Sequence, residues 1–116
     1  MKTRAGPRSI REAKAGAGFL LVTHSPVPGQ PGRRYVLAAN ERTLTLGRGV
    51  EADIVLPDEE VSHIHARLTL LEGTRFIADN ESTNGTFVAG RRVSSETLRE
   101  GDLIQVGRTT LRYEGR

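Results

Sequence analysis

The chain of 116 residues lacks cysteine and tryptophan and has only two tyrosines and three phenylalanines. Without cysteine there are no disulfides, no thiolate metal ligands and no cysteine nucleophile, and a reducing compartment is favoured. No stretch approaches the roughly 18 apolar residues of a membrane-spanning helix. Residues 13–18 are too short and too weakly apolar for the core of a secretory signal. We therefore expect a cytoplasmic protein without a membrane segment.

Positive charge is concentrated at the N-terminus. Residues 1–18 hold five basic residues and one acidic residue, whereas the remainder holds 12 basic and 13 acidic residues. A nearly neutral body offers no basic platform for nucleic acid. Because residues 1–18 also lack a hydrophobic period, we predict a disordered basic arm there and one domain over residues 19–116. Fifteen of the seventeen basic residues are arginine, which favours a GC-rich, bacterial coding sequence.

From residue 19 onward, short segments with alternating polar and apolar residues are separated by turn residues, as is typical of β-strands. Glu72-Gly73 and Gly107-Arg108 predict hairpin turns, and the three prolines between Ser25 and Gly32 predict a loop. No window shows a helical stripe. Around ten closely spaced strands predict an all-β sandwich. The expected strands occupy residues 19–23, 34–38, 42–46, 53–56, 66–71, 74–78, 86–88, 103–106 and 109–113.

Three of the expected loops carry more polar side chains than a turn needs. Gly47-Arg48 directly follows an expected strand, residues 62–65 read Ser-His-Ile-His just before another, and residues 82–86 read Ser-Thr-Asn-Gly-Thr. Strand ends of a sandwich gather at two poles, so loops that are distant in sequence can converge. An arginine, hydroxyls and a side-chain amide at one point suit a tetrahedral anion attached to a peptide.

These motifs, in this order and spacing, resemble the signature of the forkhead-associated (FHA) domain family, and the resemblance covers about residues 19–113. It implies a β-sandwich of about eleven mostly antiparallel strands. It further implies a module of signal transduction that binds phosphothreonine-containing segments of partner proteins, the substrates of a serine/threonine kinase. On this basis we expect neither catalysis nor a cofactor.

The resemblance assigns a role to each matching side chain that faces the ligand. Arg48 resembles the arginine that binds the phosphate, and a guanidinium can donate to two phosphate oxygens. Ser62 resembles the hydroxyl that donates to the phosphate, and Thr83 a second hydroxyl beside the phosphothreonine. Asn84 resembles the residue that holds the main chain of the ligand. We expect all four, together with His63, to form the phosphopeptide site.

Other matching residues are architectural. Gly47, His65 and Gly85 match positions that shape the loops, with His65 bracing the loop that bears Ser62 and Gly85 supplying a positive φ. The chain departs from the family at Ala89-Gly90, where an asparagine-glycine turn is common.

Two further departures bear on binding. The family often has arginine or asparagine at the position of His63, and an imidazole there predicts binding that depends on pH near neutrality. The loop Asp58-Glu59-Glu60 is acidic, which predicts that acidic residues about three positions after the phosphothreonine are disfavoured.

Three other hypotheses are compatible with the sequence. His63 and His65 would share one face of a strand, a spacing found in metal-dependent β-fold enzymes, with His24 or a carboxylate as the third ligand. A degenerate FHA scaffold would bind partners without phosphate. Finally Thr3, between Lys2 and Arg4, is a plausible kinase target, so the phosphorylated arm could occupy the site of its own or a neighbouring molecule.

Overall fold

The computed structural model describes residues 17–115, which form strands and no helix. Within this range there is accordingly no helix with the length and apolar character needed to cross a membrane. The expected arm over residues 1–18 falls almost entirely outside the described residues. Gly18 already belongs to β1 (Gly18–His24), where it pairs with Gly115 and Leu37. The folded domain therefore begins one residue earlier than expected.

The described residues form two sheets, as the all-β prediction requires. The six-stranded sheet has the order β2-β1-β11-β10-β7-β8 and adds to β1 the strands β2 (Arg34–Leu37), β7 (Thr86–Val88), β8 (Arg91–Val93), β10 (Leu103–Val106) and β11 (Thr109–Gly115). The five-stranded sheet has the order β4-β3-β5-β6-β9 and comprises β3 (Thr43–Gly47), β4 (Ile54–Val55), β5 (Ala66–Leu71), β6 (Thr74–Asp79) and β9 (Ser95–Thr97). Among the paired strands with a recorded register, only β3 and β4 run parallel.

Two strands were not predicted from the sequence. The segments of β8 and β9 are three residues each and are rich in polar side chains, so they show no alternation of their own. They form because β7 and β6 offer edges with which they pair in antiparallel register. The total of eleven strands in the described range agrees with the FHA-like fold that the resemblance implies.

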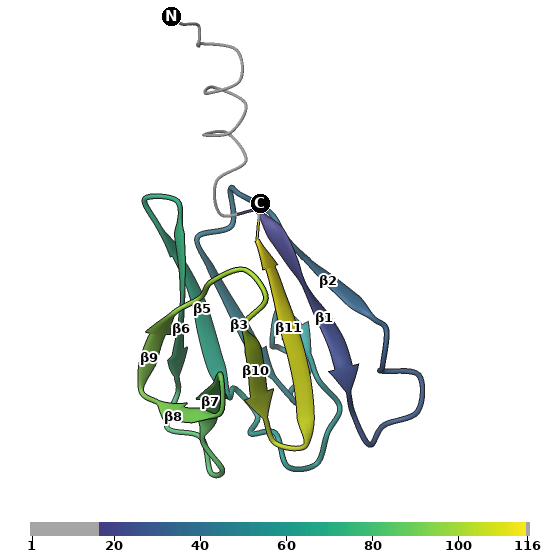
Figure 1. The fold of residues 1–116 in the computed structure, drawn as a ribbon. Coiled ribbons are helices and arrows are strands. Elements are labelled where there is room, and N and C mark those ends of the chain that lie inside the picture. Colours follow the sequence, from purple (N-terminus) through teal and green to yellow (C-terminus); the bar gives the residue numbers. More distant parts are fainter. Residues whose placement is uncertain (1–16, 116) are drawn as a thin grey trace, which may run out of the picture.

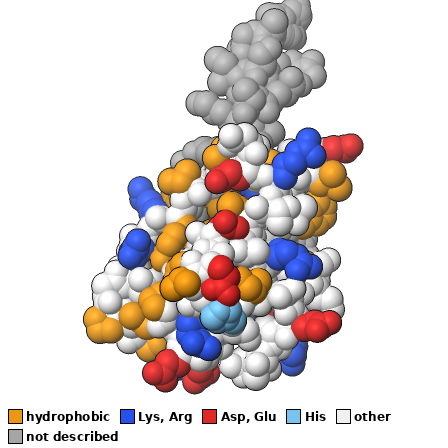
Figure 2. Space-filling view, turned by 180° about the vertical axis from the view of Figure 1, so that it is seen from behind, with side chains coloured by type: hydrophobic (Ala, Val, Ile, Leu, Met, Phe, Trp, Pro, Cys, Tyr) orange, Lys and Arg blue, Asp and Glu red, His pale blue; other side chains and the backbone are white. Residues whose placement is uncertain are grey.

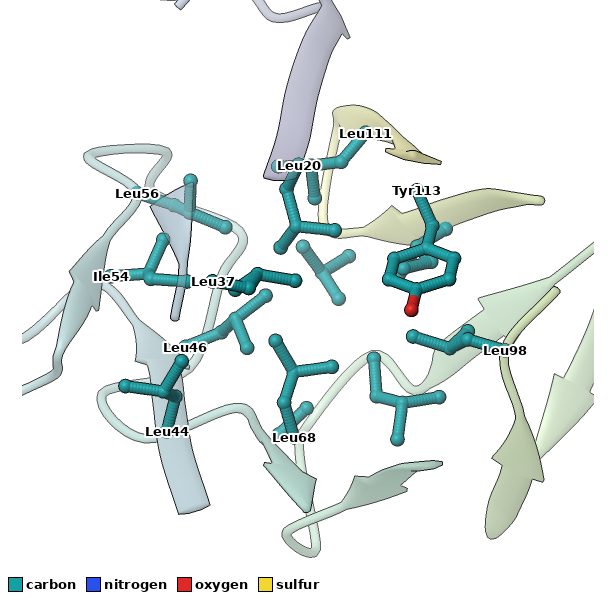
Figure 3. Packing of buried hydrophobic residues seen from close by; sticks show 14 of the residues in the cluster. Leu20, Leu37, Leu44, Leu46, Ile54, Leu56, Leu68, Leu98, Leu111 and Tyr113 are labelled. Atoms are coloured by element: carbon teal, nitrogen blue, oxygen red, sulfur yellow. The ribbon is translucent and has the colours of Figure 1, made fainter. Parts of the chain in front are cut away.

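The core lies between the two sheets and is built from the inward positions of their strands. Leu20 and Leu111 come from the six-stranded sheet and meet Leu46 and Leu68 of the five-stranded sheet, all four fully buried (Figure 3). Burying one such side chain stabilises the fold by about 1.5–3 kcal/mol. The sandwich is thus held together by aliphatic packing, with Tyr113 at one edge of the cluster.

One inward position is occupied by a charged side chain. In β6, Arg75 and Ile77 are buried, whereas Phe76 is only partly buried. Arg75 donates hydrogen bonds to the carbonyl oxygens of Glu41 (3.1 Å) and Ala38 (3.5 Å). Burial lowers the pKa of Arg75, although Tyr113 and Glu41 partly oppose the shift. The side chain thereby ties the connection between β2 and β3 to the core.

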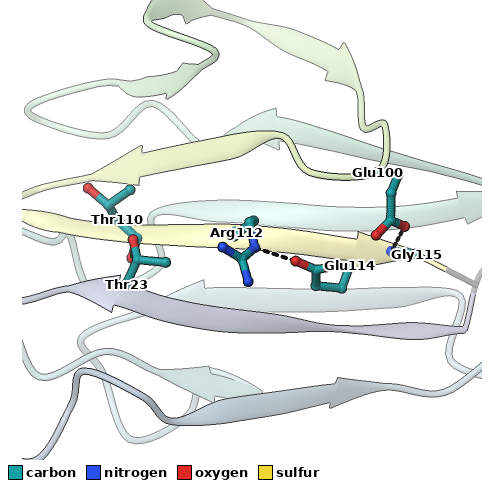
Figure 4. A network of polar contacts seen from close by, with 6 residues as sticks. All are labelled: Thr23, Glu100, Thr110, Arg112, Glu114 and Gly115. Carbon is teal, nitrogen blue, oxygen red and sulfur yellow. Dashed lines mark hydrogen bonds and ion pairs between the residues drawn. The ribbon is translucent and has the colours of Figure 1, made fainter.

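The central strand β11 is also fastened by side chains. Thr23 in β1 donates from its hydroxyl to the carbonyl oxygen of Thr110 (3.3 Å), and at the other end Gly115 N donates to the Glu100 carboxylate (2.8 Å). An ion pair within the strand lies between these two contacts (Figure 4). The first contact joins β11 to β1, and the last joins the end of β11 to the connection between β9 and β10.

The segments that carry the polar motifs gather at one end of the sandwich. β1 begins and β11 ends at the upper end in Figure 1, whereas the β3–β4, β4–β5, β6–β7 and β10–β11 connections lie at the lower end. Both predicted hairpins are confirmed. Glu72 (φ 52°) and Gly73 (φ 81°) have the positive φ pair of a type I′ turn, and Gly107 (φ 58°) opens the β10–β11 turn.

Candidate functional site

Arg48 directly follows β3 and lies at the rim of the lower end. Its backbone N donates to the carbonyl oxygen of Ser62 (3.0 Å), and its Nε donates to that of Val61 (3.1 Å). Gly47 permits this approach, because a Cβ there would lie 2.0 Å from the carbonyl oxygen of His63. The Arg48 side chain is exposed and its Nη atoms have no partner among residues 17–115. The guanidinium is therefore fixed at its base and available at its tip.

Ser62 and Thr83 come from different loops and meet directly. The backbone N of Thr83 donates to Ser62 Oγ (3.0 Å). A hydroxyl that accepts one hydrogen bond keeps its own hydrogen for another acceptor. Thr83 is exposed, and within the described range its hydroxyl has no partner. The hydroxyl of Ser62 is thus in contact with the backbone of Thr83, and each of the two residues keeps a hydroxyl hydrogen for an outside acceptor.

Asn84 extends the same surface towards the β4–β5 connection. Its Nδ2 donates to the carbonyl oxygen of Glu60 (2.9 Å), and the residue is exposed. One amide hydrogen and the carbonyl oxygen Oδ1 remain for an outside partner. An amide with one free donor and one free acceptor matches the two hydrogen-bonding groups of an extended peptide.

His65 connects the loop that bears Ser62 to the loop that bears Asn84. Its ring is fully buried; Nδ1 accepts from the backbone N of Ser62 (3.0 Å), and Nε2 lies 2.8 Å from the carbonyl oxygen of Gly85. Since Nδ1 accepts and the carbonyl can only accept, the ring is neutral with its hydrogen on Nε2. Gly85 has φ +91°, the positive value expected from the sequence.

The loop from residue 80 to 85 is further held by Asp79, which the sequence analysis missed. One oxygen of its carboxylate accepts from the hydroxyls of Ser82 (2.5 Å) and Thr86 (2.7 Å), and the other accepts from Ser82 N (3.1 Å). Burial alone would raise the pKa of Asp79, but these hydrogen bonds outweigh it and hold the pKa below its ordinary value of 3.8. The Asp-x-x-Ser spacing at a strand end was the available signal.

His63 lies beside the site but is paired within the chain. Its Nε2 is 2.5 Å from Glu51 Oε2, and the two side chains are 62% and 55% exposed. Glu51 belongs to the β3–β4 connection and was not among the expected site residues. In Figure 2, which shows the rear face, a histidine lies against acidic and basic side chains near the lower end. The pH dependence expected from His63 stays a prediction.

The metal-site hypothesis is wrong in its geometry. The segment that carries His63 and His65 is not a strand, so the two rings do not share a strand face. His63 is exposed, whereas His65 is buried with both ring nitrogens engaged. Within residues 17–115 no group of three histidine or carboxylate side chains is arranged to hold a metal ion.

The acidic loop also differs from expectation. Asp58 is 1% exposed, and its carboxylate accepts hydrogen bonds from Thr109 Oγ1 (2.8 Å), Arg108 N (2.8 Å) and Glu60 N (2.9 Å). Asp58 therefore joins the β4–β5 connection to the β10–β11 turn and does not face a ligand. Of the three acidic residues in this loop, only Glu59 and Glu60 expose their side chains to solvent.

Comparison with known sequences identifies this arrangement. A sequence model of the FHA domain matches residues 44–107, which contain all the expected site residues. The chain belongs to the FHA domain family. Its FHA fold also matches a solved structure, described as a study of phosphothreonine-dependent FHA domain interactions, with a TM-score of 0.75 and 30% identity over 86% of this chain and 97% of that one.

Two curated bacterial relatives are named for regulatory roles. The oxoglutarate dehydrogenase inhibitor of Corynebacterium diphtheriae is 39% identical over 97 residues, which are 84% of this chain and 64% of the relative. The glycogen accumulation regulator GarA of Mycolicibacterium smegmatis is 32% identical over 109 residues, 94% of this chain and 66% of the relative. The chain thus spans slightly less than two thirds of the length of these relatives.

Proposed function

We propose that this FHA domain binds phosphothreonine-containing segments of partner proteins and so makes their association depend on a serine/threonine kinase. In this proposal Arg48 and Ser62 bind the phosphate, Thr83 lies beside it, and Asn84 holds the main chain of the ligand. The domain acts as a binding module without a catalytic step or a cofactor.

The observation that carries the proposal is the shared platform of three loops. Three hydrogen bonds of 2.9–3.1 Å join the loops to one another. They run from Thr83 N to Ser62 Oγ, from Arg48 Nε to the carbonyl oxygen of Val61, and from Asn84 Nδ2 to the carbonyl oxygen of Glu60. They fix the three loops to one another while leaving side-chain donors for an outside partner. A phosphate has oxygen acceptors for such donors, and charge-assisted hydrogen bonds are the stronger ones.

The names of the relatives support a regulatory role. One is an inhibitor of oxoglutarate dehydrogenase and another a regulator of glycogen accumulation. We propose that this chain likewise controls a partner protein by binding it. The phosphate-binding side chains favour regulation by phosphorylation over a degenerate scaffold that ignores phosphate.

Arg48→Ala provides the test, with Arg42→Ala as the matched control. Both arginines are exposed, and they flank opposite ends of β3. Loss of charge-assisted hydrogen bonds worth about 1.5–3 kcal/mol should weaken phosphopeptide binding about 10- to 100-fold in Arg48→Ala. Arg42→Ala should bind like the wild type. Calorimetry with a phosphothreonine peptide and its unphosphorylated form measures both effects.

Two outcomes would contradict the proposal. Equal affinity of the wild type and Arg48→Ala would show that the phosphate does not bind at Arg48. Equal affinity for phosphorylated and unphosphorylated peptides would favour the phosphate-independent scaffold instead.

A further inference from the structure

A pair of adjacent arginines precedes two serines at the end of β8. Residues 91–95 read Arg-Arg-Val-Ser-Ser, and both arginines and both serines are exposed. The chain has one other arginine pair, at residues 33–34, and no serine or threonine follows it within three residues. Positive charge just before a hydroxyl is a pattern by which a kinase with an acidic substrate groove selects its targets.

The backbone around Ser94 suits binding by a kinase. β8 is the last strand of the six-stranded sheet and, within the described range, pairs on one side only, with β7. Figure 1 shows β8 at the lower end of the molecule, beside β7. Ser94 follows β8 and belongs to no strand, whereas Ser95 pairs with Ala78 of β6. Because an extended segment at a sheet edge can be bound through its free edge, Ser94 is the more accessible of the two serines.

Ser94 lines a hollow of about 340 Å³ beside the β6–β7 loop. The other lining residues are Asp79, Glu81, Arg92 and Val93. The carbonyl oxygen of Ser94 accepts a hydrogen bond from Asp79 N (2.8 Å), which holds the two residues next to each other. The hydroxyl of Ser94 has no hydrogen-bond partner within residues 17–115. It can therefore be modified without breaking a side-chain contact of the fold.

The charges around the hollow predict how a phosphate on Ser94 would act. Two carboxylates and one guanidinium line the hollow, so it is already net negative. A phosphate adds about −1.5 to −2 charges at pH 7. It would repel the carboxylates of Asp79 and Glu81 and attract the guanidinium of Arg92.

Both effects reach the β6–β7 loop, which carries Thr83 and Asn84. The carboxylate of Asp79 holds this loop through hydrogen bonds. Arg92 packs so closely against Gly85 that a Cβ on Gly85 would lie 2.7 Å from Arg92 Nε. A phosphate that repels Asp79 and draws Arg92 away from Gly85 weakens two supports of the loop.

We propose that Ser94 is a phosphorylation site for an arginine-directed serine/threonine kinase, and that its phosphate loosens the β6–β7 loop and weakens phosphopeptide binding. Ser94 Oγ forms a bond to the γ-phosphorus of ATP while the bond from that phosphorus to the bridging oxygen breaks and ADP leaves. The hydroxyl proton passes to the catalytic aspartate of the kinase. The effect on binding rests on the proposed phosphothreonine binding, whereas the modification itself does not.

Mass spectrometry tests the modification. The chain of 116 residues is incubated with MgATP and the catalytic subunit of cyclic-AMP-dependent protein kinase, and fragmentation locates the phosphate. Phosphate should appear on Ser94, and Ser95→Ala should be modified on Ser94 at the same rate. Phosphate on Ser95 alone, or on neither serine, would overturn the assignment.

The effect on binding is measured by calorimetry with a phosphothreonine peptide. Kinase-treated wild type is compared with equally treated Ser94→Ala, so that phosphate elsewhere in the chain affects both alike. The treated wild type should bind about 5-fold or more weakly, the lower end of the typical coupling between two sites. Before treatment the two proteins should bind alike. Equal affinities after complete phosphorylation of Ser94 would overturn the regulatory role.

Ser94→Asp and Ser94→Asn isolate the effect of charge, because the two side chains have nearly the same shape. Ser94→Asp should bind the peptide about 2- to 5-fold more weakly than Ser94→Asn, the range of exposed charge pairs. The difference should shrink at about 1 M salt, where charges are strongly screened. Ser95 does not line the hollow, so Ser95→Asp should bind like the wild type. Equal weakening in Ser94→Asp and Ser95→Asp would show that the hollow has no special role.

The failures of the two proposals are distinguishable. If the untreated wild type binds the phosphothreonine peptide and phosphate on Ser94 leaves its affinity unchanged, the regulatory role fails and the proposed function stands. If the untreated wild type binds no phosphothreonine peptide, the proposed function fails together with the effect on binding. In that case the mass spectra still decide whether Ser94 is a kinase target.

Discussion

At the residue scale, two side chains shape the site from below without facing the ligand. The ring of His65 bonds both to Ser62 N and to the carbonyl oxygen of Gly85. The Asp79 carboxylate accepts hydrogen bonds from the hydroxyls of Ser82 and Thr86. Both side chains provide hydrogen-bond partners for polar groups in the loops. Leaving such a group without a partner would cost about 1–3 kcal/mol. The positions of Ser62 and the β6–β7 loop therefore depend on these two residues as much as on the loop sequence.

Asp79→Asn should destabilise the fold in a pH-dependent way. The folded pKa of Asp79 is lower than its ordinary value of 3.8. Its stabilising effect is therefore fully present above about pH 4 and is lost as the pH falls through the lower folded value. At pH 7 the amide, which cannot accept all three hydrogen bonds, should lower the free energy of unfolding by about 1–3 kcal/mol. Urea unfolding at several pH values measures it.

The matched control is Glu81→Gln, because Glu81 is exposed in the same loop without a partner among the described residues. It should unfold like the wild type at every pH. A difference between the wild type and Asp79→Asn that stays constant from pH 7 to pH 3 would contradict the assignment.

His63→Arg should change how phosphopeptide affinity depends on pH. Imidazole gains its charge near neutrality, whereas arginine is charged throughout. If His63 turns from Glu51 to the phosphate, wild-type affinity should rise as the pH falls from 8 to 7, and His63→Arg should lack this rise. Calorimetry at both pH values decides it. Identical profiles would mean that His63 does not face the ligand.

At the scale of elements, the short β7–β8 hairpin carries strain that the rest of the sandwich tolerates. Ala89 has φ 52° and Gly90 has φ 82°, the two positive values of a type I′ turn. Alanine is poorly suited to the left-handed region, where asparagine is several-fold enriched. The hairpin forms nonetheless because Ala89 N also donates to the carbonyl oxygen of Leu103 (2.9 Å).

Ala89→Asn should therefore stabilise the protein. Relief of the left-handed alanine should raise the free energy of unfolding by up to about 1 kcal/mol. Ala89→Val is the opposite control, because a β-branched residue at positive φ is a genuine outlier and should destabilise. Thermal unfolding of the three proteins measures both shifts. Equal midpoints for asparagine and valine would show that the turn is not strained.

At the scale of the whole molecule, β1 begins at the end opposite the site (Figure 1). Residues 1–16, with the proposed kinase target Thr3, lie outside the described residues. Gly18 lies fifteen positions after Thr3 in the chain, and an extended segment of that length reaches about 50 Å. The seven residues of β1 span only about 23 Å. Chain length thus permits the arm to reach the site of its own molecule.

Phosphorylation of Thr3 should weaken binding of an external phosphopeptide. A tethered phosphothreonine competes at the millimolar effective concentration typical of flexible linkers. The affinity of the phosphorylated chain is compared with that of the unphosphorylated chain and of Thr3→Ala by calorimetry, and gel filtration separates binding within one molecule from binding between two. Equal affinities would show that the phosphorylated arm does not compete for the site.

The sequence alone determined the fold class and which residues are expected at the site. Alternation with a period of two depends on neighbouring residues only, so nine of the strands could be predicted from short segments. Gly47-Arg48, Ser62-x-x-His65 and residues 82–86 could be joined into one signature because their order and spacing are written in the chain.

The tertiary structure decided which polar side chains face inward. Asp58 was expected at the surface but is buried by Thr109, 51 residues away, and Arg75 faces inward because the Glu41 and Ala38 carbonyl oxygens meet it. A buried polar group is stable only where its partners are brought to it. Strand order in the two sheets determines which loops meet at one end of a sandwich. Local sequence patterns do not predict this order.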